Sequence, residues 1–214
     1  MMQRLVLLSE WKTDISSELE KRIMSLIGKE RPLLGYIPSQ TDSDGTYYYT
    51  MKNRLDRLGF FDYVYCDIDE AFETRVLGNL GNCDAIFLSG GNTFHFLARL
   101  RERQMLDWLR SYVDRGGVII GVSAGAMIMT ENIKTAEFVD VKYLGSSPLS
   151  PSQYTALGLV DFYFYPHWIE EPSQHRAINE LKRSDNTAIF ACLDGGGIVI
   201  DGDIREYFGH LIEY

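Results

Sequence analysis

A serine flanked by two glycines is the strongest chemical signal in the sequence. Gly121, Ser123 and Gly125 have the spacing G-x-S-x-G, which places a serine on a strained turn between a strand and a helix in many hydrolases. The hydroxyl on such a turn is exposed at the carboxyl end of the sheet, where it can attack a carbonyl. A helix starting at Ala124 would point free N–H groups at a developing oxyanion. The pentapeptide alone fits an ordinary glycine-serine turn equally well.

A nucleophilic serine needs a base that takes its proton. Among the four histidines, His167 stands between Pro166 and Trp168, directly after the apolar run 159–166. A histidine beside a tryptophan is usually a packed core residue, but its place at a strand end, together with Ser123, favours the base. The other three are placed less well, within predicted helices or near the C-terminus: His95, His175 and His210.

The third residue of such a relay is a carboxylate that holds the base. Glu137 and Asp140 follow the predicted serine turn, and Asp161 lies on the run leading to His167. The order serine, acid, histidine would then match other hydrolases with this turn. We rank Glu137 first, Asp140 second and Asp161 third, and each could instead be a solvated surface carboxylate.

Gly90 and Gly91 follow a second apolar run, 84–88. A backbone N–H beside Ser123 requires a residue without a side chain, so Gly91 and Ala124 could form a two-donor oxyanion hole. Each donor contributes about 3 kcal/mol in comparable sites. The alternative is an ordinary Gly-Gly turn. The phosphate-binding patterns G-x-x-x-x-G-K-[ST] and G-x-G-x-x-G are missing from the sequence, which disfavours a nucleotide enzyme.

The elements that must position these residues alternate between strand and helix from residue 4 to residue 130. This alternation is typical of a parallel, doubly wound sheet, whose ligands bind at the carboxyl ends of the strands. We expect strands at 4–8, 32–38, 63–66, 84–88 and 118–122, and helices at 17–27, 47–58, 70–80, 105–115 and after Gly91, where Asn92 or Thr93 caps the helix.

The second half of the chain is less regular. We expect a long loop around Pro148, Pro151 and Gly158, then a strand at 159–166 and a helix at 172–182. Three short strands are expected at the end, at 187–193, 197–200 and 204–208, joined by hairpin turns at 194–197 and 201–203. With no visible linker, residues 1–214 are expected to form one α/β domain.

Composition narrows the class of protein. The chain has 214 residues, 45% of them hydrophobic and 24% charged, as in ordinary globular proteins. A net charge of -9 argues against a general nucleic-acid binder. Three widely spaced cysteines (Cys66, Cys83 and Cys192) form no disulfide or metal pattern and suit a reducing cytoplasm. Since no apolar run approaches the ~20 residues of a membrane span, we expect no membrane association.

Three strand-end motifs together resemble a known family. They are LSGGNTF at 88–94, GVSAGA at 121–126 and PHW at 166–168, and they are similar, in the same order, to motifs of the aspartyl dipeptidase and cyanophycinase family of serine peptidases. The resemblance implies a flavodoxin-like fold as in class I glutamine amidotransferases, a mostly parallel sheet between helices, with serine replacing cysteine. It implies Ser123 as nucleophile, His167 as base and Gly91 as oxyanion donor, and Glu137 aligns best with the family's acid.

The resemblance also bears on the substrate. The aspartyl dipeptidases read a substrate aspartate with an arginine that follows the histidine, and Arg176 lies in that region. We assign Arg176 to substrate binding, together with Gly90 and Asn92 of the first motif. Glu170 and Glu171 make the intervening loop more acidic, which favours an amine or a basic group unless both are simply solvated.

The predicted function is a serine peptidase that cleaves a peptide or related amide bond in a small substrate through an acyl-enzyme on Ser123. The mechanism needs no metal or organic cofactor. Two alternatives stay open: another serine acyl hydrolase such as an esterase, and a non-catalytic ligand-binding or regulatory protein that keeps the fold. The expected partner is a small peptide, with no nucleic acid and no membrane, and a homodimer is left open.

Overall fold

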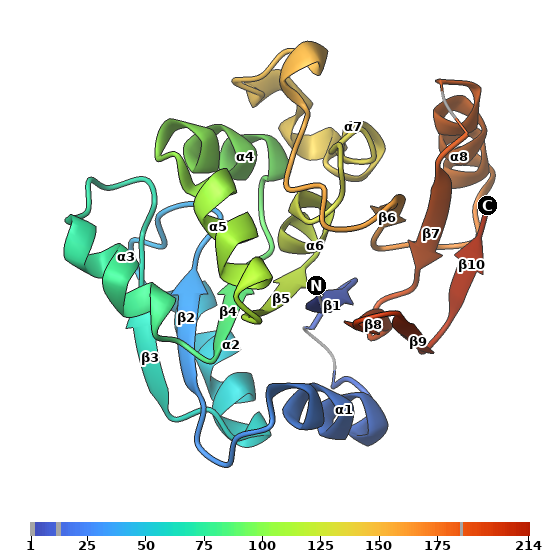
Figure 1. Cartoon of the computed structure of the whole chain (residues 1–214). Helices are drawn as coiled ribbons and strands as arrows, with labels where there is room; N and C mark the ends of the chain where they lie inside the picture. Colours follow the sequence, from blue (N-terminus) through green and yellow to red (C-terminus); the bar gives the residue numbers. More distant parts are fainter. Residues whose placement is uncertain (1–2, 12–13, 185) are drawn as a thin grey trace.

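The computed structural model describes residues 3–11, 14–184 and 186–214 (Figure 1). Its main feature is a seven-stranded sheet in the order β3-β2-β4-β5-β1-β8-β9. The first five of these are parallel, whereas β8 runs antiparallel to β1 and β9 antiparallel to β8. The strands are β1 (Arg4–Leu8), β2 (Leu33–Ile37), β3 (Asp62–Tyr65), β4 (Ala85–Leu88), β5 (Val118–Val122), β8 (Gly197–Asp201) and β9 (Ile204–Phe208).

Helices cover both faces of this sheet, because successive side chains of a strand point to opposite faces. Leu5 and Leu7 of β1 pack in one apolar cluster with side chains of α4, α5 and α6. Val6 and Leu8 pack in a second cluster with α1 and α2. The helices are α1 (Ser17–Ile27), α2 (Thr46–Leu58), α3 (Thr74–Gly81), α4 (Thr93–Glu102), α5 (Met105–Asp114) and α6 (Ala124–Ile128). The expected mostly parallel, three-layer α/β fold is confirmed.

A second, three-stranded sheet in the order β10-β7-β6 stands beside the first (Figure 1). It consists of β6 (Phe162–Tyr165), β7 (Ala188–Cys192) and β10 (Leu211–Glu213), and β6 and β7 are parallel. Phe162 and Phe164 of β6 belong to the main apolar cluster. Tyr163 and Tyr165, on the other face, pack against α8 (Pro172–Ser184). Shorter helical turns precede this sheet: α7 (Ala136–Val139), η1 (Val141–Ser146) and η2 (Pro151–Gln153).

Three sequence-based expectations need correction. The turn 194–197 does not close a hairpin, since β7 and β8 lie in different sheets. The helix expected from Glu70 begins only at Thr74, and β10 was not expected. None of the helices in the described ranges is long and apolar enough to cross a membrane.

Candidate active site

Ser123 lies on a sharp turn between β5 and α6, as its glycine spacing predicts. Its φ of 51° and ψ of -107° are strained values for a residue with a side chain. A Cβ on Gly121 would lie 2.5 Å from the carbonyl carbon of Gly125, and one on Gly125 would lie 2.2 Å from the Leu88 oxygen. Both flanking glycines are therefore required, because strand and helix backbones nearly touch here. The turn is tied to β1, since the Ser123 N–H donates to the Leu8 oxygen at 2.9 Å.

The structure brings Ser123 and His167 together although 44 positions separate them. Ser123 Oγ and His167 Nε2 lie 2.8 Å apart. His167 follows β6 with a φ of 57°, so both members of the pair have a positive φ, which residues with a side chain rarely adopt. Strain of this kind persists only where the surrounding structure enforces it, and it is common at active sites.

The carboxylate on His167 is Asp194, which the sequence analysis did not consider. Asp194 Oδ1 lies 2.7 Å from His167 Nδ1. Since a carboxylate only accepts, Nδ1 carries the hydrogen, and Nε2 of the neutral ring accepts the Ser123 hydroxyl proton. The two residues meet because β6 and β7 are parallel neighbours whose carboxyl ends share one edge of the small sheet. The order along the chain is thus serine, histidine, acid.

The three carboxylates predicted for this position lie elsewhere, so the ranking that put Glu137 first is wrong. Glu137 lies beside Tyr154, where burial and then the charge of this carboxylate raise the pKa of the phenol. Asp140 is buried and accepts the Thr93 N–H at 2.9 Å, at the start of α4. Asp161 pairs with Arg205 at 3.0 Å. Each carboxylate serves another part of the fold.

Ser9 is a site residue that sequence reasoning missed. Its hydroxyl oxygen accepts the His167 N–H at 2.7 Å and lies 3.0 Å from both Asp194 Oδ1 and the Cys192 oxygen. The side chain is fully buried at the end of β1, next to the strand that carries Ser123. Ser9 thus fixes the backbone of the base and one oxygen of the acid. Its one signal in the sequence is its position directly after the apolar run 4–8.

The Gly90–Gly91 turn lies beside Ser123 because β4 and β5 are parallel neighbours. A Cβ on Gly90 would lie 3.5 Å from the Ser123 Cβ. The Gly125 N–H donates to the Ser89 oxygen at 3.2 Å, which ties this turn to the first turn of α6. Within the described ranges, neither Gly91 nor Ala124 donates its N–H to a protein acceptor. Among the described residues, these two N–H groups therefore have no protein acceptor; one belongs to the turn beside Ser123 and the other to the residue directly after it.

The remaining predicted binding residues have other surroundings. Asn92 is the N-cap of α4, since its side chain accepts the His95 N–H at 3.1 Å. Arg176 is exposed on α8, as are Glu170 and Glu171 just before that helix. The helix is anchored near His167 through its neighbour Trp168, whose ring lies 5.1 Å from that of His175 on α8. Arg176 is the next residue after His175 on this helix.

The cysteines are unsuited to act as nucleophiles. Cys66, Cys83 and Cys192 are all free and buried. Burial, reinforced by the charge of Asp194, raises the pKa of the Cys192 thiol to about 12. Burial likewise raises the pKa of Cys66 to about 11 and that of Cys83 to about 12. All three thiols therefore stay protonated at neutral pH. Among the residues that the structure describes, no cluster of His, Cys, Asp or Glu could hold a metal ion.

Comparison with known proteins gives one family. The model of peptidase family S51 matches residues 5–206. An uncharacterised peptidase of Pasteurella multocida is 32% identical over 142 residues, 64% of this chain and 65% of that protein. Peptidase E of a Nostoc species is 29% identical over 175 residues, 78% of this chain and 66% of that protein. A protein of Drosophila melanogaster named probable alpha-aspartyl dipeptidase is 38% identical over 104 residues, 48% of this chain and 40% of that protein. The matches therefore span slightly less than two thirds of the first two relatives.

Solved structures agree with the architecture. A Peptidase E candidate from Listeria monocytogenes superposes with a TM-score of 0.77 at 25% identity, covering 98% of this chain and 100% of that one. A peptidase from an acI-B1 actinobacterium gives a TM-score of 0.69 at 17% identity, covering 100% of this chain and 98% of that one. The second match concerns the fold alone.

Proposed function

This chain belongs to peptidase family S51, and on that premise we propose that it is a serine peptidase that hydrolyses a peptide bond in a small substrate. The observation that carries the proposal is the continuous relay Ser123–His167–Asp194, with contacts of 2.8 Å and 2.7 Å. Serine acyl transfer requires a nucleophile, a base in contact with it and a group that orients the base. Here Ser123, His167 and Asp194 provide these three groups, each in contact with the next.

In the proposed first step, Ser123 Oγ attacks the scissile carbonyl carbon while His167 Nε2 takes the hydroxyl proton. Asp194 keeps the Nδ1 hydrogen in place, so the ring presents an unprotonated Nε2 to the serine. The carbonyl oxygen becomes an oxyanion, which the N–H groups of Gly91 and Ala124 stabilise. His167 then gives its proton to the leaving amine, and the peptide bond breaks to leave an acyl-enzyme.

In the second step, a water molecule takes the place of the amine. His167 removes a proton from the water, which attacks the acyl carbon, and the oxyanion forms again between the same two donors. The ester bond breaks, and the proton on His167 returns to Ser123 Oγ. The proposed cycle thus uses groups of the protein and water only.

Dipeptides are the substrate class to test first, with aspartyl dipeptides at the head of the panel. One relative is named as a probable alpha-aspartyl dipeptidase, and Arg176 is an exposed cation on the helix that follows His167. Glu170 and Glu171 are exposed directly before the same helix, and their negative charges would favour a substrate with a basic group. A panel with acidic, neutral and basic N-terminal residues separates these specificities.

The test compares the wild type with Ser123→Ala and with Ser111→Ala, which alters an exposed serine on α5. We expect Ser123→Ala to lower kcat for the best dipeptide by roughly 10⁴-fold or more, whereas Ser111→Ala leaves it unchanged. Turnover of nitrophenyl esters without turnover of any dipeptide would favour an esterase. Equal activity of Ser123→Ala and wild type would favour a protein whose serine has no catalytic role.

Three further properties belong to the proposal. The family match over residues 5–206 fits one hydrolytic domain. Free, buried cysteines fit a reducing compartment such as the cytoplasm. A homodimer stays a prediction that light scattering can check.

A further inference from the structure

The peptide unit that joins Gly90 to Gly91 is held from its carbonyl side by two hydroxyl groups. Ser39 Oγ donates to the Gly90 oxygen at 2.8 Å, and Ser89 Oγ donates to the same oxygen at 3.0 Å. The two serines are also joined to each other, because the Ser39 N–H donates to Ser89 Oγ at 2.8 Å. Both side chains are buried, and Ser39 is only 2% exposed.

Holding this carbonyl controls the direction of the Gly91 N–H. A trans peptide is planar, with its C=O and N–H pointing in opposite directions, and the described chain contains no cis peptide bond. A hydrogen bond to the carbonyl also polarises the peptide unit, which makes its N–H a better donor. Ser39 occupies the space beside Gly91 so closely that a Cβ on that residue would lie 2.1 Å from the Ser39 hydroxyl oxygen.

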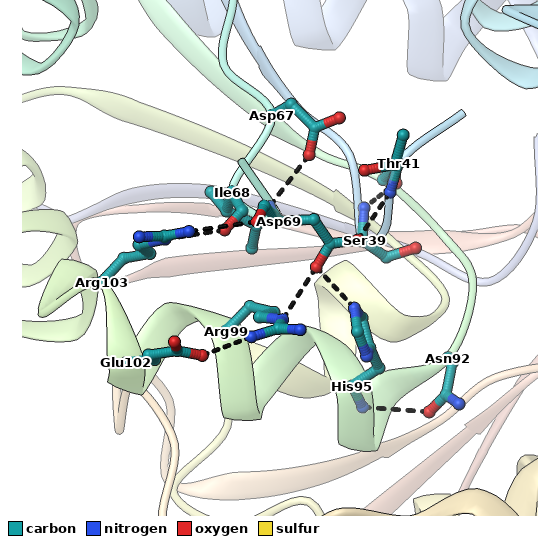
Figure 2. A network of polar contacts seen from close by, with 11 residues as sticks. Ser39, Thr41, Asp67, Ile68, Asp69, Asn92, His95, Arg99, Glu102 and Arg103 are labelled. Atoms are coloured by element: carbon teal, nitrogen blue, oxygen red, sulfur yellow. Dashed lines mark hydrogen bonds and ion pairs between the residues drawn. The ribbon is translucent and has the colours of Figure 1, made fainter. Parts of the chain in front are cut away.

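The loop that carries Ser39 is itself fixed to the helix that follows Gly91 (Figure 2). The Thr41 N–H donates to Asp69 Oδ2 at 2.8 Å. The other oxygen of Asp69 lies 2.6 Å from His95 Nε2 and 2.9 Å from Arg99 Nε, both on α4. Asp69 therefore joins the Ser39 loop to α4, the helix that begins two residues after Gly91.

We propose that Ser39 is a positioning residue for catalysis: its hydroxyl orients and polarises the Gly90–Gly91 peptide so that the Gly91 N–H meets the oxyanion. This inference rests on the proposed function, because it requires attack by Ser123. Ser39 acts through the peptide and contacts neither the nucleophile nor the base. Its effect is therefore on the transition state and hardly on substrate binding.

The first test measures the rate of covalent labelling by an alkyl fluorophosphonate. Ser123 Oγ attacks phosphorus, fluoride leaves with the P–F bond electrons, and His167 takes the hydroxyl proton, while the phosphoryl oxygen occupies the oxyanion hole. We expect Ser39→Ala to slow labelling on the order of tenfold, a weaker effect than loss of a donor itself. Ser39→Thr, which keeps the hydroxyl, recovers most of the rate, and Ser111→Ala labels like the wild type.

The second test separates a positioning role from a purely structural one. With the best dipeptide, Ser39→Ala is expected to lower kcat about tenfold and to change KM less than twofold, at a temperature where thermal melting shows the variant to be folded. A wild-type labelling rate in folded Ser39→Ala, or equal slowing in folded Ser39→Ala and Ser39→Thr, would overturn the inference.

If Ser39→Ala does not fold, Ser89→Ala removes the other hydroxyl from the same carbonyl. Slower labelling of that variant supports the inference, and unchanged labelling overturns it.

These outcomes are distinct from failure of the proposed function. An unlabelled wild type, or a Ser123→Ala variant that labels as fast as the wild type, would contradict the serine mechanism itself. The role of Ser39 alone would be contradicted if the wild type is labelled, Ser123→Ala is not labelled, and Ser39→Ala is labelled as fast as the wild type.

Discussion

At the residue scale, the orientation of His167 depends on a carboxylate that is half exposed. The Asp194 side chain is 50% exposed and that of His167 is 34% exposed. Water and salt screen the charge of such a pair, so its main contribution is geometric. Asp194 keeps the imidazole in the tautomer that accepts from Ser123, and Ser9 keeps the backbone of His167 in its strained conformation.

The first prediction concerns the identity of the acid. We expect Asp194→Asn to lower kcat by roughly 10²–10³-fold, somewhat less than for a buried triad carboxylate, because the side chain is partly solvated. Glu137→Gln is the matched control and should keep kcat within about twofold, since Glu137 lies beside Tyr154 instead. Steady-state kinetics on the best dipeptide measures both. A larger loss in Glu137→Gln than in Asp194→Asn would return the acid to the position ranked first from sequence.

At the element scale, the site depends on how closely α6 approaches the strand ends. Gly125 lies against the end of β4, and its N–H bonds to Ser89 just beyond that strand. A larger residue there would push α6 away from β4 and separate Ala124 from Gly91. The distance between the two proposed oxyanion donors, Gly91 and Ala124, therefore depends on the contact of Gly125 with the end of β4.

The second prediction tests this contact. Gly125→Ala should lower the free energy of unfolding by at least about 2 kcal/mol, because the added methyl meets backbone atoms that cannot move aside. Gly78→Ala on α3 is the control: nothing lies within 4 Å of its added Cβ. That change should raise stability by about 0.5–1 kcal/mol through helix propensity. Urea denaturation checks both, and equal stability of Gly125→Ala and wild type would exclude the close approach.

At the scale of the whole molecule, the relay crosses from one sheet to the other. Ser9 and Ser123 follow strands of the seven-stranded sheet, whereas His167 and Asp194 follow strands of the small one. Phe162, Phe164 and Phe190 of the small sheet pack into the main apolar cluster. The distance between nucleophile and base is thus set by how the two sheets pack.

The molecule carries a net charge of -9. Among its carboxylates, Asp69 joins the Ser39 loop to α4, and this connection depends on pH. Burial raises the pKa of Asp69, but hydrogen bonds from Thr41 and His95, with the charges of His95 and Arg99, outweigh it and leave the pKa lowered. A carboxyl with a lowered pKa contributes stability in full above its unfolded pKa of about 4. That contribution is lost as the pH falls through the folded pKa.

The third prediction follows from that sign. At pH 6, Asp69→Asn should have a lower free energy of unfolding than the wild type. The difference should shrink as the pH falls below about 4, where the native carboxyl becomes protonated as well. Urea denaturation of both proteins at several pH values measures the difference. A difference that is constant across this range would show that the charge of Asp69 contributes nothing.

Local patterns in the sequence predicted most of the elements and two of the candidate site residues, Ser123 and His167. Apolar runs and helical periodicity located β1, β2, β4 and β5, since burial on both faces of a parallel sheet needs continuous apolar strands. The glycines around Ser123 and the strand end before His167 were local signals as well. Each of these signals depends only on residues close together in the sequence, so it can be recognised without knowing the tertiary structure.

The acid and its support were decided by tertiary structure alone. Asp194 stands in a glycine-rich stretch that has the local appearance of a hairpin turn, and Ser9 looks like a capping residue. Their roles arise because β7 pairs with β6 in a separate sheet, while β1 lies next to β5. Such pairings join segments far apart in the chain, and their choice depends on packing free energy summed over the whole core. No local pattern carries that information, so the sequence by itself pointed to Ser123 and His167, which the structure places in contact, but not to the carboxylate beside His167.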